Sequence, residues 1–498
     1  MATRPLVNSD ARRLALACAI MIAVAAGIVA KPLLSPPMVH DSFWIDYVWA
    51  RQFAAELAEG NFYPRWLPSS FGGLGAPVFY FYPPVAFYLV AMLDLAGFAT
   101  YPGIILVFGL SFFASGAGAY LLFRRTARWP LAGALLFMVA PYHLLDFTVR
   151  GALGESVAIA LLPFLLIGLG RIAEGKGWHL ACLCYASMIL THLPFALLAS
   201  LFVIAPFAVM KRERLVPTTI AVGIALGLAA IYLVPAIMLA PFRDEAQLYN
   251  EARLLPGYWS LYAGNWNDPF FVGIHLVIAS IAVPAALLAV RDRDWRLIYA
   301  LAICALAAGL VPLFWSLPTV LKVQFSFRAL PFAEIALAAY VAHRGRAQGK
   351  RLYLLALPLV AGWAALAMVI PTQQSLADLD RLMPDVPEYL PPGVLAERPA
   401  IGEWPDLRLG RVPPPDRGAD TIVEPIFYFP IWSCGTADPA TKLLAHPADC
   451  RPRRIDAPTE GWSRIVSAVS LLILAALWLG RRRKVAASNK SGLSRSRT

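Results

Sequence analysis

The apolar stretch GIILVFGLSFFASGAGAYLLF, residues 103–123, decides the fold class, and Arg124 and Arg125 follow it directly. It carries no charged residue and matches the roughly 20 residues that a helix needs to cross a bilayer core of about 30 Å. Similar stretches recur along the 498 residues, of which 59% are hydrophobic and only 15% charged. Because about a quarter of the residues in an average soluble domain are charged, we predict an all-α polytopic membrane protein.

We expect about twelve membrane-spanning helices. They are predicted near residues 13–30, 103–123, 129–146, 153–170, 178–192, 194–210, 216–240, 271–290, 296–315, 328–343, 352–370 and 463–480. Lys and Arg in short loops mark the cytoplasmic side of a membrane. If the further apolar stretch 81–98 does not span, the seven basic clusters of the chain all fall on one face. If it spans, every cluster after the first changes sides.

The basic clusters therefore predict cytoplasmic termini and a segment 81–98 that lies in the interface or re-enters the membrane. Tyr82-Pro83-Pro84 near its start fits this reading, because tyrosine favours the headgroup level and two prolines do not continue a helix. The formal net charge of +12 resides largely in these clusters. It is interpreted as a topology signal, and no nucleic-acid partner is expected.

The predicted organisation has four parts. These are a transmembrane module (residues 1–370) with a large first outer loop (31–102) containing juxtamembrane helices, a Pro-rich extracytoplasmic segment with little regular structure (371–462), a last transmembrane helix (463–480) and a basic cytoplasmic tail (481–498). The first apolar run is read as an uncleaved span, with a cleaved signal peptide as the alternative. Cys434 and Cys450 fall in the outer segment, where either a disulfide or two free thiols would fit.

Two carboxylates open the first outer loop. Asp41 precedes an amphipathic helical pattern that ends at Gly60, so one interpretation is a helix N-cap. The other interpretation is a base at the membrane boundary that accepts a proton from a substrate hydroxyl. Asp46 is a second catalytic candidate, but five residues place it about 140° around a helix from Asp41, so Asp41 is preferred.

Further polar candidates lie on the same predicted face, where ionisable side chains at a bilayer are costly without a role. The substrate-binding candidates are Arg65, Tyr82, His143, Arg150, Glu155, His192, Gln324 and Arg328. Arg150 and Glu155 form either a structural ion pair or, through Arg150, a phosphate site. Arg328 is either a snorkelling side chain or a second phosphate ligand, and His192 is most simply a capping or packing residue.

A resemblance joins these residues. Its elements are Asp41…Arg51…Gly60…Pro64-Arg65-Trp66…Gly72…Gly75-Ala76-Pro77…Phe81-Tyr82-Pro83-Pro84…Tyr88, then Pro141-Tyr142…Arg150-Gly151-Ala152…Glu155 and Gln324-Phe325-Ser326-Phe327-Arg328. Over roughly residues 10–345 the chain resembles polytopic glycosyltransferases of the GT-C type. More narrowly, it is similar to the bacterial membrane family labelled "6-pyruvoyl-tetrahydropterin synthase-related". That label does not imply pterin chemistry, because the soluble enzyme uses a three-His zinc site that this sequence does not supply.

The resemblance implies an inverting glycosyltransferase of the bacterial inner membrane with a periplasmic active site. The implied donor is a polyprenyl-phosphate-linked sugar, and the acceptor is a glycan, lipid or protein of the cell envelope. The acidic residue that serves as the base or helps hold a metal in such enzymes matches Asp41. Relatives often carry an adjacent Asp-Glu pair, whereas residue 42 here is serine. The metal site therefore stays unknown, and the only cofactor left open is a divalent cation.

Two other functions remain as alternatives. A transporter or flippase of a lipid-linked glycan would place polar groups near the bilayer midplane and often show a repeated half. No convincing internal repeat is visible, and the polar candidates gather at the outer boundary, apart from Glu334. The third reading is a non-catalytic subunit of an envelope-assembly complex.

Overall fold

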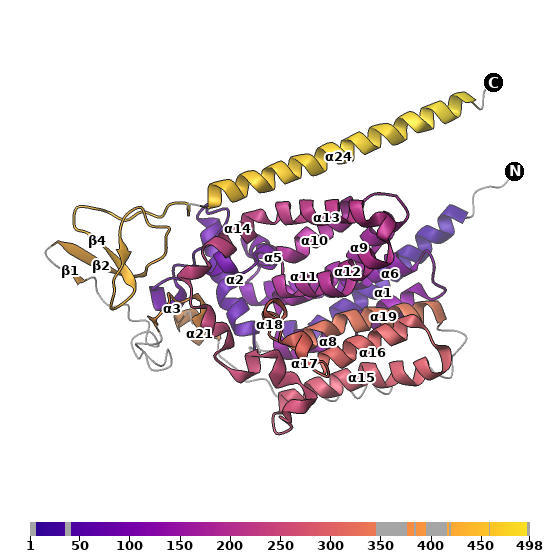
Figure 1. Cartoon of the computed structure of the whole chain (residues 1–498), viewed down its shortest axis with the longest axis horizontal. Helices are drawn as coiled ribbons and strands as arrows, with labels where there is room; N and C mark the ends of the chain where they lie inside the picture. The colour runs from indigo at the N-terminus through magenta and orange to yellow at the C-terminus, as the bar shows by residue number, and fades with distance from the viewer. Residues whose placement is uncertain are drawn as a thin grey trace.

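The computed structural model describes residues 6–34, 41–344, 376–382, 385–394, 416–417, 420–457 and 459–495, which form a bundle of helices with a small sheet at one end (Figure 1). The bundle contains α1 (Leu6–Leu34), α6 (Thr100–Phe123), α7 (Pro130–Met138), α8 (Pro141–Leu145), α9 (Leu153–Ala173), α10 (His179–Ile189), α11 (Leu193–Ala199), α12 (Ala205–Met210), α13 (Leu215–Leu228), α14 (Ala230–Met238), α15 (Pro269–Asp292), α16 (Trp295–Ala307), α19 (Leu330–Arg344) and α24 (Glu460–Arg495). The other α-helices are α2 (Phe43–Ala58), α3 (Ser70–Gly73), α4 (Val78–Phe81), α5 (Val85–Leu95), α17 (Pro312–Trp315), α18 (Pro318–Leu321) and α21 (Leu376–Leu382).

Within the described residues, seven helices are long and apolar enough to cross a membrane. They run over Asp10–Leu34, Thr100–Phe123, Pro130–Arg150, Leu153–Ala173, Leu193–Met210, Pro269–Asp292 and Glu460–Gly480. The predicted spans 178–192, 296–315 and 328–343 contain shorter helices, and 352–370 lies outside the described residues. The count of twelve therefore stays a prediction.

The predicted span 216–240 is broken into α13 and α14, which meet at an angle of 67°. Ser467 of α24 lies at the break. Its hydroxyl accepts a hydrogen bond from the backbone N–H of Ile231 at 2.8 Å and approaches the carbonyl of Leu228 at 3.0 Å. A side chain that inserts into the backbone ladder in this way is a common cause of a sharp bend.

Residues 81–98 do not form a spanning helix. Their helix, α5, has 11 residues, and at 1.5 Å per residue it reaches about half of the bilayer core. It packs on α2 through aromatic pairs, with ring centroids 4.8 Å apart for Phe53 and Tyr88 and 6.4 Å for Phe53 and Phe87. This arrangement agrees with the interfacial position that the basic clusters predict.

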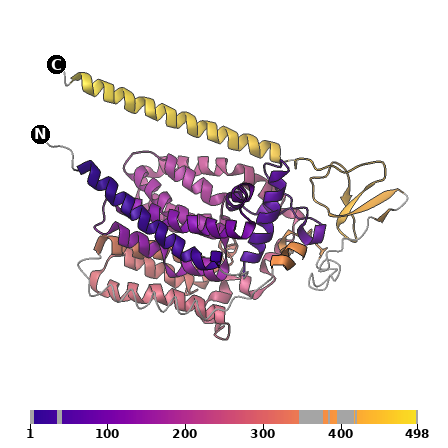
Figure 2. The same cartoon turned by 180° about the vertical axis from the view of Figure 1, so that it is seen from behind.

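The start of α1 and the end of α24 lie at the same end of the bundle. Figures 1 and 2 show the start of α1 and the end of α24 on one side, with the sheet and helices α2, α3 and α21 on the opposite side.

The segment 371–462 contains more regular structure than its proline content predicts. It holds a four-stranded antiparallel sheet of order β1-β2-β4-β3, with strands β1 (Asp416–Arg417), β2 (Thr421–Phe427), β3 (Thr436–Ala437) and β4 (Leu443–Pro447). Pro425 lies where the pairing of β2 shifts register between Glu424 and Phe427, so it removes no regular ladder bond. Cys434 and Cys450 are joined by a disulfide, with Cα atoms 6.7 Å apart.

Helix α21 and the residues that follow it pack against α2. The indole N–H of Trp49 donates to Asp385 at 2.9 Å, and the hydroxyl of Tyr47 donates to Asp380 at 3.0 Å. Burial raises the pKa of Asp385 to about 6 against an ordinary 3.8, although hydrogen bonds from Ser70, Val386 and Trp49 oppose the rise. Between pH 4 and 6, Asp385 therefore keeps its proton when this segment is packed on α2 and releases it when the segment is detached.

This difference predicts pH-dependent docking of residues 385–394. Docking is strongest below pH 4 and weakens as the pH rises towards 7, because burial also raises the pKa of Glu388 in the same segment to about 7 and both folded pKa values are the raised ones. Hydrogen exchange of these residues, corrected for intrinsic rates, should show the loss of protection. Asp385→Asn should remove the part of the loss that occurs between pH 4 and 6, and an unchanged profile in that variant would contradict the assignment to Asp385.

Candidate functional site

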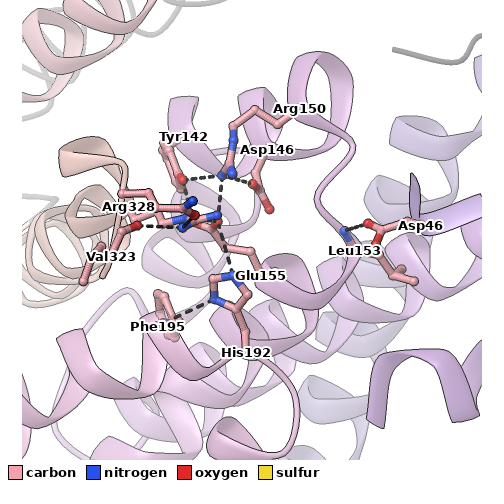
Figure 3. A network of polar contacts seen from close by, with 11 residues as sticks. Asp46, Tyr142, Asp146, Arg150, Leu153, Glu155, His192, Phe195, Val323 and Arg328 are labelled. Carbon is pink, nitrogen blue, oxygen red and sulfur yellow. Dashed lines mark hydrogen bonds and ion pairs between the residues drawn. The ribbon is translucent and has the colours of Figure 1, made fainter. Parts of the chain in front are cut away.

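Glu155, near the start of α9, holds two arginine side chains inside the bundle (Figure 3). Its Oε2 atom accepts a hydrogen bond from Nη1 of Arg150 at 2.7 Å and another from Nε of Arg328 at 3.0 Å. Glu155 is fully buried, and Arg150 is only 2% exposed. One carboxylate is therefore shared by two guanidinium groups that are distant in sequence, and we refer to these three residues as the arginine cluster.

Arg150 makes all of its side-chain hydrogen bonds through a single nitrogen. Nη1 also contacts Asp146 Oδ1 at 2.8 Å and the hydroxyl oxygen of Tyr142 at 2.9 Å. Arg328 uses Nε for Glu155 and Nη1 for the carbonyl of Val323, at 2.7 Å. Among the described residues, no hydrogen bond involves Nη2 of either arginine, so each keeps donors for a ligand.

The local backbone brings these groups together. Asp146–Arg150 forms a π-helical turn, η1, and Gly151 follows in the left-handed conformation with φ of 62°. A Cβ atom at Gly151 would lie 2.6 Å from the Cβ of Phe43. Only glycine allows both this φ and this close approach without strain, so the turn can pack directly on the start of α2.

Glu334 of α19 fixes Tyr142 from the other side. Its Oε1 accepts the backbone N–H of Tyr142 at 2.6 Å, and the hydroxyl of Tyr142 donates to Oε1 of Glu155 at 2.5 Å. Glu334 thus orients the short helix α8 and, through Tyr142, the carboxylate of Glu155. This explains a buried acidic residue that lies deeper in the bundle than the other polar candidates.

Two phenylalanines border the guanidinium groups. The centre of the Arg150 guanidinium lies 5.2 Å from the ring centroid of Phe325 and 5.5 Å from that of Phe327, and Arg328 lies 4.6 Å from Phe325. Such contacts favour a cation over a ring face and exclude water from one side of the cluster.

Asp41 lies beside the arginine cluster. The backbone N–H of Ser42 donates to the carbonyl of Arg150 at 2.9 Å, and this bond fixes the neighbouring Asp41. The Asp41 side chain is exposed, yet removal of most of its hydration raises its pKa, while Arg150 and Arg328 act in the opposite direction. The helix α2 begins after Ser42, so Asp41 is not the N-cap considered above.

Asp46 has a structural contact. Its buried Oδ2 accepts the backbone N–H of Leu153 at 2.9 Å, which caps the first turn of α9 and ties that helix to α2 (Figure 3). Burial raises the pKa of Asp46 to about 7, opposed by the bond from Leu153 and the charge of Arg150. The preference for Asp41 over Asp46 as a base is consistent with this placement.

Three more predicted residues border the cluster. Nε2 of His192 lies 3.9 Å from Glu155 Oε2, and its Nδ1 accepts the N–H of Phe195, so His192 caps α11. Oε1 of Gln324 lies 3.5 Å from Nη1 of Arg328. The hydroxyl of Tyr82 lies 3.3 Å from the position of a Cβ on Gly154, next to Glu155.

The structure does not bring Arg65 or His143 into the arginine cluster. Arg65 lies 3.3 Å from Glu460 at the start of α24 and donates to the carbonyl of Ile231 at 2.8 Å. His143 is buried, and its Nδ1 lies 2.9 Å from the carbonyl of Phe137. Both side chains are therefore committed to other neighbours, which sequence order alone does not reveal.

Tyr142, Asp146 and Glu334 complete the polar network, although the sequence did not single them out as site residues. The signal for Tyr142 and Asp146 was present, since both are polar side chains in the same short apolar hairpin as Arg150. Within the described residues, no group of three or more His, Cys, Asp or Glu side chains is arranged to hold a metal ion.

Comparisons with known proteins give the following matches. A family model described as "6-pyruvoyl-tetrahydropterin synthase related domain; membrane protein" matches residues 79–377. No curated protein matches the chain.

Solved structures match at low identity. The arabinofuranosyltransferase AftD from Mycobacteria has a TM-score of 0.43 and 18% identity over 72% of this chain. This chain spans only 28% of that protein. The Archaeoglobus fulgidus oligosaccharyltransferase, in a complex with Zn and sulfate, has a TM-score of 0.42 and 14% identity over 84% of this chain and 59% of its own.

Proposed function

The chain belongs to the membrane-protein family described as the 6-pyruvoyl-tetrahydropterin synthase related domain, and from this premise we propose that it is a membrane-bound glycosyltransferase. The proposed donor is a sugar on a polyprenyl phosphate, and the acceptor is a glycan, lipid or protein of the cell envelope. The reaction takes place on the extracytoplasmic side of the bacterial inner membrane, with both termini in the cytoplasm.

The observation that carries the proposal is the pairing of Arg150 and Arg328 on Glu155 beside Asp41. Sugar transfer from a lipid phosphate releases an anion, whose growing charge is stabilised by cations that are already held in place. Glu155 holds both guanidinium groups without using their Nη2 donors. Planar donors of this kind suit the oxygens of a phosphate.

Asp41 is the proposed base. An acceptor hydroxyl loses its proton as its oxygen attacks the anomeric carbon, and a carboxylate within hydrogen-bond reach accepts that proton. Desolvation raises the pKa of Asp41, which strengthens it as a base, and the residue is exposed. The bond from oxygen to the anomeric carbon forms on the face opposite the departing phosphate, so the configuration inverts.

The test is mass spectrometry of envelope glycolipids and glycans from cells with and without this protein. The enzyme function predicts the loss of one defined sugar mass from one acceptor and accumulation of the unused polyprenyl-phosphate sugar. Expression of the wild-type protein in the deficient cells should restore the missing sugar. Accumulation of a complete lipid-linked glycan on the cytoplasmic side would instead favour a flippase.

A further inference from the structure

A cavity of about 530 Å³ lies at the first turn of α24, outside the arginine cluster. Its lining includes Tyr63, Arg65, Tyr80, Arg454, Asp456, Glu460 and Arg464. Among the described residues, no hydrogen bond or ion pair joins this lining to the arginine cluster. Its size is in the range of small-molecule sites. The polar groups in its wall indicate what it binds.

The acceptor atoms of this cavity are already occupied. Oε1 of Glu460 accepts from the hydroxyl of Tyr80 at 2.5 Å and from the N–H of Ala457 at 3.1 Å. Its Oε2 accepts from Nη2 of Arg464 at 2.8 Å. The two oxygens of Asp456 accept from Arg464 at 2.6 and 2.9 Å. The carboxylates therefore offer little to a ligand that donates hydrogen bonds.

The groups that lack partners are donors. Among the described residues, Nη1 of Arg65 and the hydroxyl of Tyr63 have no hydrogen-bond partner, and Arg65 is only 3% exposed. The Arg65 guanidinium lies 3.8 Å from the ring centroid of Tyr63 and 5.3 Å from that of Tyr80, which fixes its position. A buried donor without a partner destabilises the fold, and an acceptor-rich ligand would relieve this cost.

The level of the cavity in the membrane narrows the ligand further. The three arginines of its wall are paired with carboxylates, Arg454 with Glu56 and the other two with Asp456 and Glu460, so the donors without partners, and not an excess of charge, select the ligand. Glu460 begins the span Glu460–Gly480, on which Trp462, Ile465 and Val469 are exposed and face the surroundings of the bundle. Tyrosine and tryptophan side chains gather at the headgroup level of a bilayer.

We propose that this cavity binds the phosphate group of a membrane lipid, whose acyl chains lie along the exposed apolar face of α24. Arg65 and Tyr63 donate to the phosphate oxygens from the floor of the cavity, and the half-exposed Arg454 and Arg464 line its rim. The bound phosphate links the first outer loop to the last span. Its site is distinct from the site proposed for sugar transfer.

The test uses the purified full-length protein in detergent and native mass spectrometry. The probes are phosphatidylglycerol, diacylglycerol with the same acyl chains, and inorganic phosphate. Wild-type protein should retain phosphatidylglycerol and not diacylglycerol. Displacement of the lipid by millimolar inorganic phosphate would assign the site to a free phosphate, whereas retention in its presence assigns it to the lipid.

Tyr63→Phe is the decisive variant, because it removes a hydroxyl without a partner and should leave thermal unfolding unchanged or slightly improved. It should weaken phosphatidylglycerol retention about tenfold, and Arg65→Gln should weaken it at least as much. Arg253→Gln is the matched control, since this exposed arginine pairs with Asp268 outside the cavity. Equal retention of both lipids, or retention by Tyr63→Phe equal to wild type, overturns the proposal.

Discussion

Replacement of Asp41 by asparagine is expected to lower sugar transfer by about 10²–10⁴-fold, the usual contribution of a general base. Asparagine keeps the size of the side chain but does not accept a proton. Because the Asp41 side chain is exposed and does not cap α2, the variant should insert and fold as the wild type does. The measurement is the rate of transfer in membranes, normalised to folded protein.

Asp94→Asn is the matched control for this variant. Asp94 lies in the same first outer loop, is half-buried, and accepts the hydroxyl of Thr100 at 3.0 Å, a bond that an amide oxygen also accepts. The rate of sugar transfer should be unchanged in the Asp94→Asn variant. If Asp41→Asn transferred sugar at the wild-type rate, Asp41 would not be the base, and a transporter or scaffold would become the better reading.

Replacement of Glu155 by glutamine is expected to destabilise the whole bundle. The change leaves Arg150 and Arg328 buried without the carboxylate that they share, and an uncompensated buried charge costs about 3–5 kcal/mol. Thermal unfolding in detergent should occur at a clearly lower temperature, with a lower yield of folded protein.

A double variant tests whether the loss of stability comes from the unpaired charge and not from the altered shape of the side chain. Glu155→Gln combined with Arg328→Met should recover part of the lost stability, because the arginine that loses its carboxylate partner is then absent, whereas Arg150 keeps Asp146. Glu174→Gln is the control, since Glu174 follows the same helix but forms only an exposed pair with Lys176; its unfolding temperature should match wild type. Additive losses in the double variant would contradict a shared carboxylate.

The membrane fold was largely predictable, because long apolar runs have few other uses. The basic clusters also predicted that 81–98 does not span, and its 11-residue helix agrees. The sequence did not predict the break between α13 and α14, since its cause, Ser467, lies more than 200 residues further along the chain. Short helices such as His179–Ile189 also escape a length-based reading, because their ends depend on neighbours.

The candidate site was also predictable only in part. Arg150, Glu155 and Arg328 were expected on one face, and the structure brings them within hydrogen-bond distance. Arg65 has the same residue type and predicted side of the membrane, yet it pairs with Glu460. Long-range pairing of this kind leaves no periodic signal. The π-helical turn that places Asp146 against Arg150 is equally invisible to patterns based on the regular helix.

The bond between Cys434 and Cys450 provides a practical readout of orientation. The other four cysteines, Cys18, Cys182, Cys184 and Cys304, are free thiols within helices. A single reducible crosslink therefore marks the sheet end of the molecule, and such crosslinks persist only in an oxidising compartment. In intact cells, the reductant-dependent labelling of this one pair would tell which way every helix of the bundle runs, without any fusion to the chain.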